Sequence, residues 1–335
     1  MFTGNFPSST WKLMENLVAL NASNNSFSGQ VPSSFCLASA SFAVLDLQFN
    51  KFSGNIPSAL GNCSMLKVLM LGHNNLSSTI PDELFNSSTS LERLSFRNAG
   101  LRGTLDSAHV TKLTDLVALD LGENSFTSKI PESIGQLKRL EELLLDNNKM
   151  SGELPPGVQI LFVGKNFMDE AMPQDKTIDG FENLQALGID HCLLTGKMPT
   201  WLSKLKNLEV LDLSSNLLTG KIPAALNNLH FLSKFNISNN DLEGPVPTGG
   251  QLSTFPDSSF DGNPKLCGSM LTHPCNSIEE APRPIMTTRD CSEKIIFAVS
   301  FALSFGLAVL YDQIHMRPPP AAEPPSCRVH FALTN

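Results

Sequence analysis

The 335-residue sequence has few charged residues, which make up 17% of it, and only one tyrosine. Its formal net charge is -8 and no lysine or arginine cluster stands out. Nucleic acid is therefore a poor candidate partner. The first residues, MFTGNFPSSTWK, lack the basic start and the apolar run of a secretory signal. Taken alone, this start favours a cytosolic protein.

Catalytic and cofactor motifs are also missing. The sequence has no H-E-x-x-H, phosphate-binding loop or G-x-G-x-x-G motif, and its seven histidines are scattered. Asp190, His191 and Cys192 resemble a nucleophile beside a base, but neighbouring strand residues point to opposite faces. The acidic stretch Met168–Glu182 lacks the ligand spacing and glycine of a calcium loop, so we expect a solvated connection. We predict a protein that is not an enzyme and needs no cofactor or metal.

What the sequence does contain is an internal repeat, L-x-x-L-x-L-x-x-N-x-L-x-G-x-I-P. Most spacings are 24 or 25 residues, within the range of about 20–29 for leucine-rich repeats. Seven clear units share one asparagine position, which is held by Asn25, Asn50, Asn74, Asn124, Asn148, Asn216 and Asn240. Three weaker units place Ala99, Asn166 and Cys192 there.

The repeat predicts its own geometry. L-x-L alternation makes a short strand with one buried face, and the asparagine then turns the chain and bonds neighbouring coils as a ladder. One coil cannot bury its own apolar side, so stability comes from stacking. We predict an α/β solenoid, a plant-type leucine-rich-repeat horseshoe with parallel strands on its concave face. It occupies residues 1–247 in about ten units and is irregular at 157–183.

The repeat pattern ends after Val246 and Pro247, where the leucine spacing is lost and GNPKLCG follows. A solenoid end exposes its core and requires a cap. We predict that residues 248–276 form this cap and that a disulfide joins Cys267 to Cys275, which lies eight residues later. Two free thiols in a loose tail are the alternative.

The remaining cysteines and the glycosylation motifs bear on the compartment. Cys63 and Cys192 fall within repeats and are expected to be small buried residues, whereas Cys36, Cys291 and Cys327 have no evident partner. A disulfide indicates an oxidising compartment. N-x-[ST] triplets, the acceptors of N-glycans, occur at Asn21, Asn24, Asn62, Asn75, Asn86 and Asn236. Together they favour a glycoprotein of the secretory pathway, although glycans at Asn21 and Asn236 would obstruct the strand face.

An apolar segment near the C-terminus, IIFAVSFALSFGLAVLY at 295–311, contains no charged residue. As a helix it would reach about 25 Å, at the lower limit for a membrane span. We predict a transmembrane helix there, after a juxtamembrane linker at 277–294 and before a short proline-rich tail at 312–335. A buried or interfacial helix, or an incorrectly predicted end of the chain, are the alternatives.

Several stretches carry a family resemblance: SSTWK (8–12), LGNCSMLKVL (60–69), PDELFN (81–86), SIGQLKRLEEL (133–143), IDGFENLQALGI (178–189) and NNDLEGPVPTGGQLSTFPDSSFDGNPKLCG (239–268). With these, the chain resembles plant leucine-rich-repeat receptor-like proteins and receptor kinases of the tyrosine-sulfated-peptide, or phytosulfokine, receptor group. The resemblance covers roughly residues 1–275. It implies the extracellular part of a plasma-membrane receptor that binds a peptide and acts with a co-receptor kinase.

The chain departs from that family in four respects. It begins inside a repeat, without the signal peptide and the cysteine-paired N-terminal cap. Asn148 and Asn166 are only 18 residues apart, which suggests lost coils. Asn216 and Asn240 are 24 residues apart, which leaves no room for the non-repeat island that builds much of the family's peptide site. No kinase follows the apolar segment.

The exposed strand face is the best candidate for binding, because solenoids use their concave surface. Alternation places Arg93, Ser95 and Arg97 there, and later strands add Asp120, Glu142, Asp146, Asp190 and Asp212. Two arginines four residues apart could hold an anionic group, although solubility explains these charges equally well. The leading hypothesis is a membrane-anchored receptor-like protein with an extracellular peptide or protein ligand. A soluble secreted binding or inhibitor protein, and a truncated receptor fragment without independent function, are the alternatives.

Overall fold

The computed structural model describes residues 1–7, 13–35, 39–87, 90–168, 170–173, 180–269, 271–275 and 329–330. The predicted linker and apolar segment, and all but two residues of the predicted tail, lie outside these residues, so the expected transmembrane helix at 295–311 is not tested. Within the described ranges, no helix is long and apolar enough to cross a membrane. Residues 1–276 and 326–335 form one compact unit, and the following description concerns that unit.

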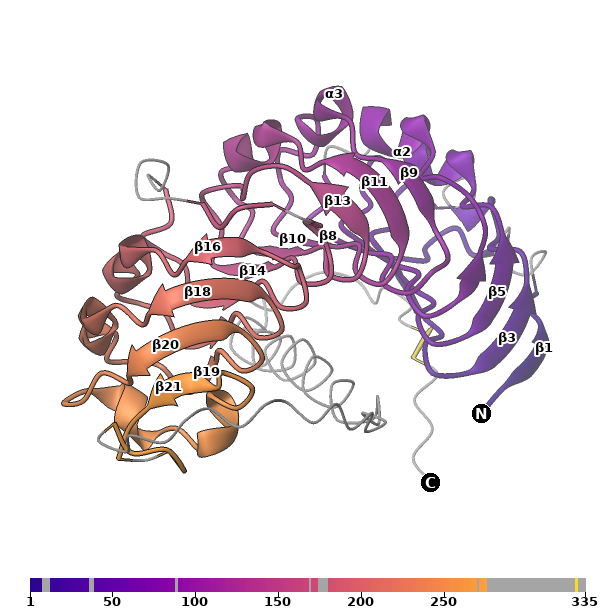
Figure 1. The fold of residues 1–335 in the computed structure, drawn as a ribbon. Helices are drawn as coiled ribbons and strands as arrows, with labels where there is room; N and C mark the ends of the chain where they lie inside the picture. Colours follow the sequence, from indigo (N-terminus) through magenta and orange to yellow (C-terminus); the bar gives the residue numbers. More distant parts are fainter. Residues whose placement is uncertain are drawn as a thin grey trace, which may run out of the picture. The chain divides into compact units, whose positions relative to one another are not determined.

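Short parallel strands form the inner sheet of the unit; each coil contributes one, and β22 from the C-terminal tail pairs with the first of them (Figure 1). The central leucine of each L-x-L strand is buried, as Leu45, Leu143 and Leu211 illustrate with 0% exposure. This alternation confirms the predicted solenoid. In the described part of the chain, the strands of this sheet are, in spatial order, β22 (Val329–His330), β2 (Ala19–Asn21), β4 (Val44–Asp46), β6 (Val68–Met70), β8 (Arg93–Ser95), β10 (Ala118–Asp120), β12 (Glu142–Leu144), β14 (Ile160–Phe162), β15 (Ala186–Gly188), β17 (Val210–Asp212) and β19 (Lys234–Asn236).

The asparagine ladder lies directly after these strands, as the repeat predicts. Asn216 shows its bonding: its side-chain oxygen accepts the backbone N–H groups of Cys192 and Leu194 at 3.1 and 3.0 Å. Its side-chain nitrogen donates to the backbone oxygens of Ile189 and Leu213 at 2.7 and 3.0 Å. The ladder asparagines thus bond backbone groups of their own coil and of the preceding coil, which satisfies polar groups that the stacking of the coils covers.

The weaker units keep the ladder position. Asn166 is 1% exposed and donates to the backbone oxygens of Leu145 and Val163 at 2.9 and 3.0 Å. Ala99 and Cys192 are buried at the equivalent places, with 0% exposure each. The residue before each ladder position has a positive φ, which makes the tight turn out of the strand; the row comprises Asn24, Phe49, His73, Asn98, Glu123, Asn147, Lys165, His191, Ser215 and Asn239.

A second set of parallel strands, which was not predicted from the sequence, runs along the side of the solenoid just after the ladder. In the described residues these side strands are β1 (Thr3–Asn5), β3 (Ser26–Gly29), β5 (Lys51–Gly54), β7 (Asn75–Leu76), β9 (Arg102–Thr104), β11 (Ser125–Lys129), β13 (Lys149–Ser151), β16 (Thr195–Lys197), β18 (Leu217–Lys221), β20 (Asp241–Pro245) and β21 (Lys265–Cys267). A proline follows many of these side strands and ends the pairing, because proline has no backbone N–H to donate to a neighbouring strand.

Most coils contain a short helix on the side opposite the inner sheet, and the chain then continues into the next inner strand (Figure 1). Several of these helices begin directly after the proline of the repeat. Pro131 and Pro223, which precede two of them, have φ values of −65° and −60°. Proline is favourable there because its fixed φ suits a first helical turn and its missing N–H has no partner to lose. The described helices are η2 (Ser58–Asn62), α2 (Asp82–Ser87), α3 (Ser107–Val110), η3 (Glu132–Gln136), η4 (Thr200–Lys204), η5 (Ala224–Asn228), η6 (Gln251–Thr254) and η7 (Asp257–Ser259).

The short spacing between Asn148 and Asn166 reflects a shortened coil that stays in register. Pro155, Pro156 and Gly157, the last with a φ of 90°, turn the chain directly into β14 without a helix. Strand β14 pairs with β12 before it and with β15 after it. The inner sheet and the ladder are thus continuous through the irregular region at 157–183.

The C-terminal cap is a degenerate last coil, which corrects the predicted end of the repeats at residue 247. Asn263 continues the ladder, since its side-chain oxygen accepts the N–H of Leu242 at 3.1 Å and its nitrogen donates to the backbone oxygen of Ile237 at 3.0 Å. The predicted disulfide between Cys267 and Cys275 is present. Cys63 is also disulfide-bonded, so the expectation that it is simply a small buried residue was incomplete.

Candidate ligand-binding face

The solvent-facing side of the inner sheet, termed the strand face, carries the predicted ligand-facing residues. Arg93 and Ser95 lie at the two ends of β8, and Arg97 follows two residues later. Asp120 ends β10, Glu142 begins β12, and Asp146 follows β12; Asp190 follows β15 and Asp212 ends β17. Except for Ser95, which is 7% exposed, their side chains are partly exposed. The structure therefore places the predicted set on one face.

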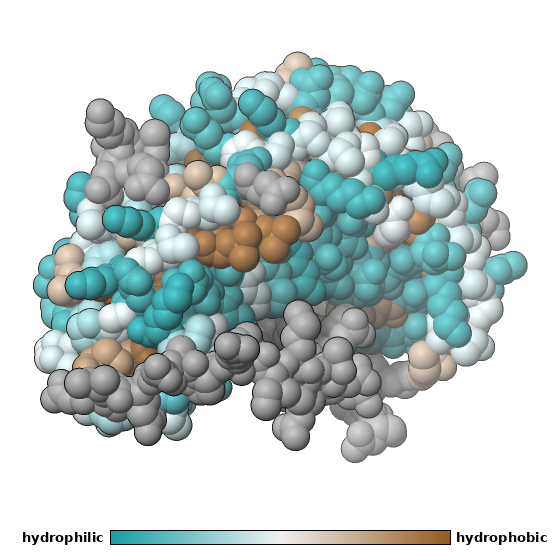
Figure 2. Space-filling view, viewed as in Figure 1, coloured by the Kyte–Doolittle hydropathy of each residue, from teal (hydrophilic) through white to brown (hydrophobic). Residues whose placement is uncertain are grey.

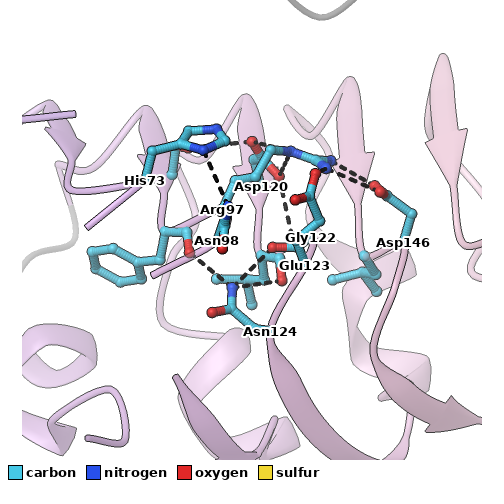
Figure 3. Close-up of polar contacts among 12 residues, drawn as sticks. His73, Arg97, Asn98, Asp120, Gly122, Glu123, Asn124 and Asp146 are labelled. Atoms are coloured by element: carbon cyan, nitrogen blue, oxygen red, sulfur yellow. Dashed lines mark hydrogen bonds and ion pairs between the residues drawn. The ribbon is translucent and has the colours of Figure 1, made fainter. Parts of the chain in front are cut away.

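Arg97 is the centre of a polar cluster on this face (Figure 3). Its Nε donates to both oxygens of Asp120 at 3.1 and 3.2 Å. One terminal nitrogen donates to Glu123 at 3.0 Å and to Asp146 at 2.9 Å, and the other donates to Asp146 at 2.5 Å. The guanidinium side chain is only 11% exposed. Four of its five N–H donors are thus used by the chain's own carboxylates.

The reach of both arginines depends on small residues in β10 and just after it. Arg93 and Glu142 lie on strands either side of β10, both in register with Ala118, and their side chains approach to 3.6 Å. Arg97 passes over Gly122: a Cβ atom at that position would lie 2.4 Å from a terminal guanidinium nitrogen. Ala118 and Gly122 therefore allow each arginine to contact a carboxylate two coils away.

The charges of the cluster do not balance. Burial alone would lower the pKa of Arg97, but the carboxylates of Asp120, Asp146 and Glu123 outweigh it and raise the pKa. Burial raises the pKa of Asp120, which the Arg97 guanidinium only partly offsets. Burial likewise raises the pKa of Glu142, against the opposing effect of Arg93. Two arginines face four carboxylates, so the cluster is net negative when all of them are ionised.

The two later acidic residues are not part of this cluster. Asp190 contacts the imidazole of His191 at 2.9 Å. Asp212 accepts the hydroxyl of Ser214 at 2.6 Å and approaches Lys234 to 3.8 Å. The strand face therefore consists of a cluster around Arg97 and separate small contacts further along the sheet.

Glu123 and His73, which stand in the turn position before the ladder, were not predicted from the sequence. Their side chains border the strand face: His73 contacts Asn98 at 3.4 Å and stacks on Phe49 with ring centroids 4.1 Å apart. The signal was present, because this position follows each strand with a fixed period and always precedes the ladder residue. Strand alternation alone does not predict its direction, since the chain turns there with a positive φ.

The chemistry of Cys192 agrees with a structural role. Its thiol is buried, and burial raises its pKa to about 12. It contacts the backbone oxygens of Asp190 and Val163 at 3.3 and 3.7 Å, as a ladder residue would. A neutral buried thiol is a poor nucleophile. Residues 169 and 174–179 of the acidic stretch Met168–Glu182 lie outside the described residues, so its predicted role as a solvated connection is not tested.

The predicted glycosylation sites differ in accessibility. Asn21, Asn24, Asn62, Asn75 and Asn86 are exposed, whereas Asn236 is partly buried. The oxygen of Asn236 accepts the N–H of Ser238 at 3.1 Å, and its nitrogen contacts Asp212 at 3.4 Å. The structure does not test whether any of them is glycosylated.

Comparisons with known proteins agree with the architecture. Two leucine-rich-repeat models match residues 182–242 and residues 16–37, 41–63, 65–87, 115–137 and 139–161, together slightly more than half of the chain. Receptor-like protein 39 of Arabidopsis thaliana is 33% identical over 31% of this chain and 12% of its own length. Receptor-like protein 3 of the same plant is 31% identical over 42% of this chain and 17% of its own length. The chain thus spans less than a fifth of these relatives.

Solved structures give a longer match. The ectodomain of the Arabidopsis receptor kinase GASSHO1/SCHENGEN3, in complex with CASPARIAN STRIP INTEGRITY FACTOR 2, superposes with a TM-score of 0.74 and 32% identity over 82% of this chain and 33% of that one. The Arabidopsis receptor kinase HAESA, in complex with the peptide hormone IDA and the co-receptor SERK1, superposes with a TM-score of 0.69 and 31% identity. This match covers 80% of this chain and 45% of that one. The chain belongs to the leucine-rich-repeat family, and its repeats are of the plant receptor-ectodomain type.

Proposed function

We propose that the chain is a membrane-anchored receptor-like protein that binds an extracellular peptide or protein through its strand face and signals through a partner kinase. The observation that carries this proposal is the polar cluster around Arg97 on the strand face, whose side chains are held in place by ion pairs and hydrogen bonds between coils. Preorganised side chains lower the cost of binding. The similar ectodomains of GASSHO1/SCHENGEN3 and HAESA, solved with a bound factor and a peptide hormone, support it.

The charge of the strand face constrains the ligand. Four of the five N–H donors of Arg97 are used by Asp120, Glu123 and Asp146, so an anionic ligand group would have to compete with three carboxylates of the chain. A ligand group that lies over this cluster is therefore better matched if it is neutral or cationic. This argues against the expected role of the arginine pair in anion binding, and it weakens the finer assignment to the phytosulfokine receptor group.

The remaining parts of the proposal concern location and chemistry. The apolar segment 295–311 anchors the chain in the plasma membrane, the repeats are extracellular and carry N-glycans, and the protein binds without catalysing a reaction. Resistance of the full chain to carbonate extraction from plant membranes distinguishes the anchored protein from a soluble secreted one.

A glycan placed on the strand face tests the proposal. Asp212→Asn creates an N-x-S triplet with Leu213 and Ser214, and Asp212 lies at the end of β17 with its side chain 16% exposed. The full chain is purified from plant-cell membranes, and the peptides that co-purify with it are identified by mass spectrometry. A glycosidase-sensitive change in mobility shows that the new site is modified.

The double variant Asp212→Asn, Ser214→Ala is the matched control, because it removes the same charge but creates no acceptor triplet. We expect co-purifying peptides with the unmodified chain and with this control, and their loss with the glycosylated variant. Peptide retention by the glycosylated variant, or no specific peptide on any of the three chains, contradicts binding through the strand face.

A further inference from the structure

The strand face has a second part, an apolar patch that adjoins the polar cluster around Arg97. Strand β14 supplies its two partly exposed members, Ile160 and Phe162, whereas Leu161 between them is buried with 0% exposure. Neighbouring strands complete the patch with outward residues in register, so that it consists of Leu144, Ile160, Phe162, Ala186 and Val210. Most of the surface that Figure 2 shows is hydrophilic, and its apolar side chains are grouped rather than evenly spread. Adjoining apolar residues on a sheet face differ from the isolated ones that any protein surface carries.

A glycine lets the ring of Phe162 lie across the strand face. A Cβ atom at Gly188, on the next strand, would collide with that ring, so the ring covers the bare backbone of β15. It therefore offers a flat apolar surface, already held in place, on which an apolar side chain of a ligand can pack. Gly122 has the same role under the guanidinium of Arg97.

The charges next to this patch are mostly negative. In the cluster itself, two arginines face four carboxylates. Lys165, in the turn after β14, adds one positive charge, and Glu141, directly before β12, adds one negative charge. Glu92, directly before β8, is paired with Lys67 of the preceding coil. With that pair set aside, the strands from β8 to β14 and their turns carry three cations and five carboxylates, so the strand face is net negative there even when Lys165 is counted.

Solvent reaches the carboxylates of the cluster more readily than it reaches Arg97. The side chains of Arg97 and Arg93 are 11% and 19% exposed, whereas the four carboxylates are between 18% and 23% exposed. A ligand group that covers the cluster removes water from these carboxylates, and a neutral group would leave their excess negative charge without hydration or a partner. A cationic group replaces the lost water with charge-assisted hydrogen bonds. The charge balance therefore favours a cationic ligand group over a neutral or an anionic one.

We propose that the strand face recognises a peptide segment with a lysine or arginine side chain over the cluster and an apolar side chain on Ile160 and Phe162. Asp120 and Phe162 are in register through Leu144, and two strand spacings measure about 10 Å, which an extended peptide covers in about three residues. The basic and the apolar residue of the ligand are therefore two or three positions apart. This inference rests on the proposed function, because it names the ligand class of the same face.

Selection from a displayed library of short random peptides tests the ligand class. The full chain is purified in detergent from plant-cell membranes and exposed to the library. Peptides that also bind the chain with the glycan of Asp212→Asn are discarded, which leaves those that need an open strand face. We expect lysine and arginine to be about threefold or more enriched among these peptides over the input library, with an apolar residue two or three positions away.

A variant with balanced charges tests the cationic group, with one selected peptide carrying a fluorophore as the probe. Glu123→Gln with Glu142→Gln removes the two excess negative charges of the cluster but keeps the size of each side chain and an acceptor oxygen. We expect about tenfold weaker binding, and no further loss when the basic residue of the peptide is replaced by glutamine. The matched control, Glu132→Gln with Glu153→Gln, removes the same charge from exposed positions in η3 and after β13 and should leave the affinity unchanged.

Phe162→Thr tests the apolar group, because threonine suits a strand but removes the ring. We expect about tenfold weaker binding of the same peptide, since its apolar side chain loses the surface on which it packs. Phe231→Thr, which removes a 65% exposed side chain outside the inner strands, leaves the affinity unchanged. Melting temperatures show whether the variants fold, and Ile160→Thr on the same strand replaces Phe162→Thr if that chain does not.

Three results overturn the inference while binding through the strand face stands. The first is a selection that enriches aspartate and glutamate, or neither sign of charge, among the peptides that need the open face. The second is equal affinity of the parent chain and the Glu123→Gln, Glu142→Gln variant for the selected peptide. The third is equal affinity of the Phe162→Thr and Phe231→Thr variants. If no selected peptide distinguishes the parent chain from the glycosylated one, peptide binding through the strand face itself fails, and the inference fails with it.

Discussion

At the residue scale, the geometry of the strand face depends on a glycine. Gly122 lies under the Arg97 guanidinium, and a Cβ atom there would meet three of its atoms at 2.4 to 2.7 Å. Gly122→Val therefore forces Arg97 away from Asp146. We expect a loss of about 2–4 kcal/mol in the free energy of unfolding, since charged hydrogen bonds are broken and carboxylates are left unpaired in a partly buried place. Denaturant unfolding monitored by circular dichroism measures it.

Gly220→Val is one comparison, but Gly220 has a φ of 77°, so a valine there adds backbone strain. Gly122→Val is therefore also made in a chain that already carries Arg97→Ala. If steric displacement of Arg97 causes the loss, valine costs much less stability in the Arg97→Ala background than in the parent chain. An equal cost in both backgrounds would show that Gly122 matters for another reason.

A second residue-scale prediction concerns His73. Burial lowers its pKa below the ordinary value of 6.5, with Glu123 opposing and Arg97 adding to the effect. The folded state therefore binds this proton less readily than the unfolded state, so its contribution to stability is present above about pH 6.5 and is lost as the pH falls through the folded pKa. We expect the drop in melting temperature from pH 7.5 to pH 5.5 to be smaller for His73→Gln.

The control for this prediction is His230→Gln, which removes an exposed histidine. It should leave the drop in melting temperature unchanged. An identical pH profile for His73→Gln and the parent chain would contradict the assignment. The range stops at pH 5.5 because burial also raises the pKa values of Asp120 and Glu142, which stabilises the folded state increasingly in more acidic solution.

At the scale of elements, the cap disulfide gives a local prediction. The bond between Cys267 and Cys275 closes a loop with a sequence separation of 8, for which chain entropy gives about 2–3 kcal/mol. Cys267→Ser with Cys275→Ser should destabilise the last coils more than the middle of the array, because each coil is held mainly by its neighbours. Hydrogen exchange should become faster in β20 and β19 while β8 stays protected; a uniform increase in all strands would contradict a local cap.

Elements also differ in how far the sequence predicts them. The inner strands and the ladder follow from a period that every coil repeats, so even Asn166 in the shortened coil is placed correctly. The last coil was missed because Phe260 and Leu266 replace the usual leucine spacing, although Asn263 keeps its ladder role. The side strands were missed because they depend on pairing between coils rather than on a pattern within one coil.

The site shows the same limit. Strand alternation predicts which side chains point to solvent on the strand face. The structure places there the predicted residues Arg93, Arg97, Asp120, Glu142 and Asp146. Alternation does not predict their partners, because the contact of Arg97 with Asp146 joins residues 49 positions apart across an intervening coil. Whether the arginines are free to bind a ligand is therefore decided by Gly122 and by the neighbouring carboxylates, and not by the arginine spacing.

At the scale of the whole molecule, the acceptor triplets predict an uneven glycan distribution. Asn62 ends η2 and is exposed, whereas Asn236 is partly buried on the strand face with its amide bonded to Ser238 and Asp212. A glycan at Asn236 would break these contacts, so chains that carry it should fold poorly. Glycopeptide mapping of the membrane-bound protein should find Asn62 modified and Asn236 unmodified.

Two variants make this prediction sharp. Ser64→Ala removes the triplet at Asn62 and should eliminate one glycan, whereas Ser238→Ala, which removes the triplet at Asn236, should leave the glycan mass unchanged. High occupancy at Asn236 in correctly folded protein would mean that the strand face tolerates a large group beside Asp212, and the glycan planned at position 212 would then be a poor block of ligand binding. Absence of glycans at every acceptor position would remove the support that these triplets give to an extracellular protein.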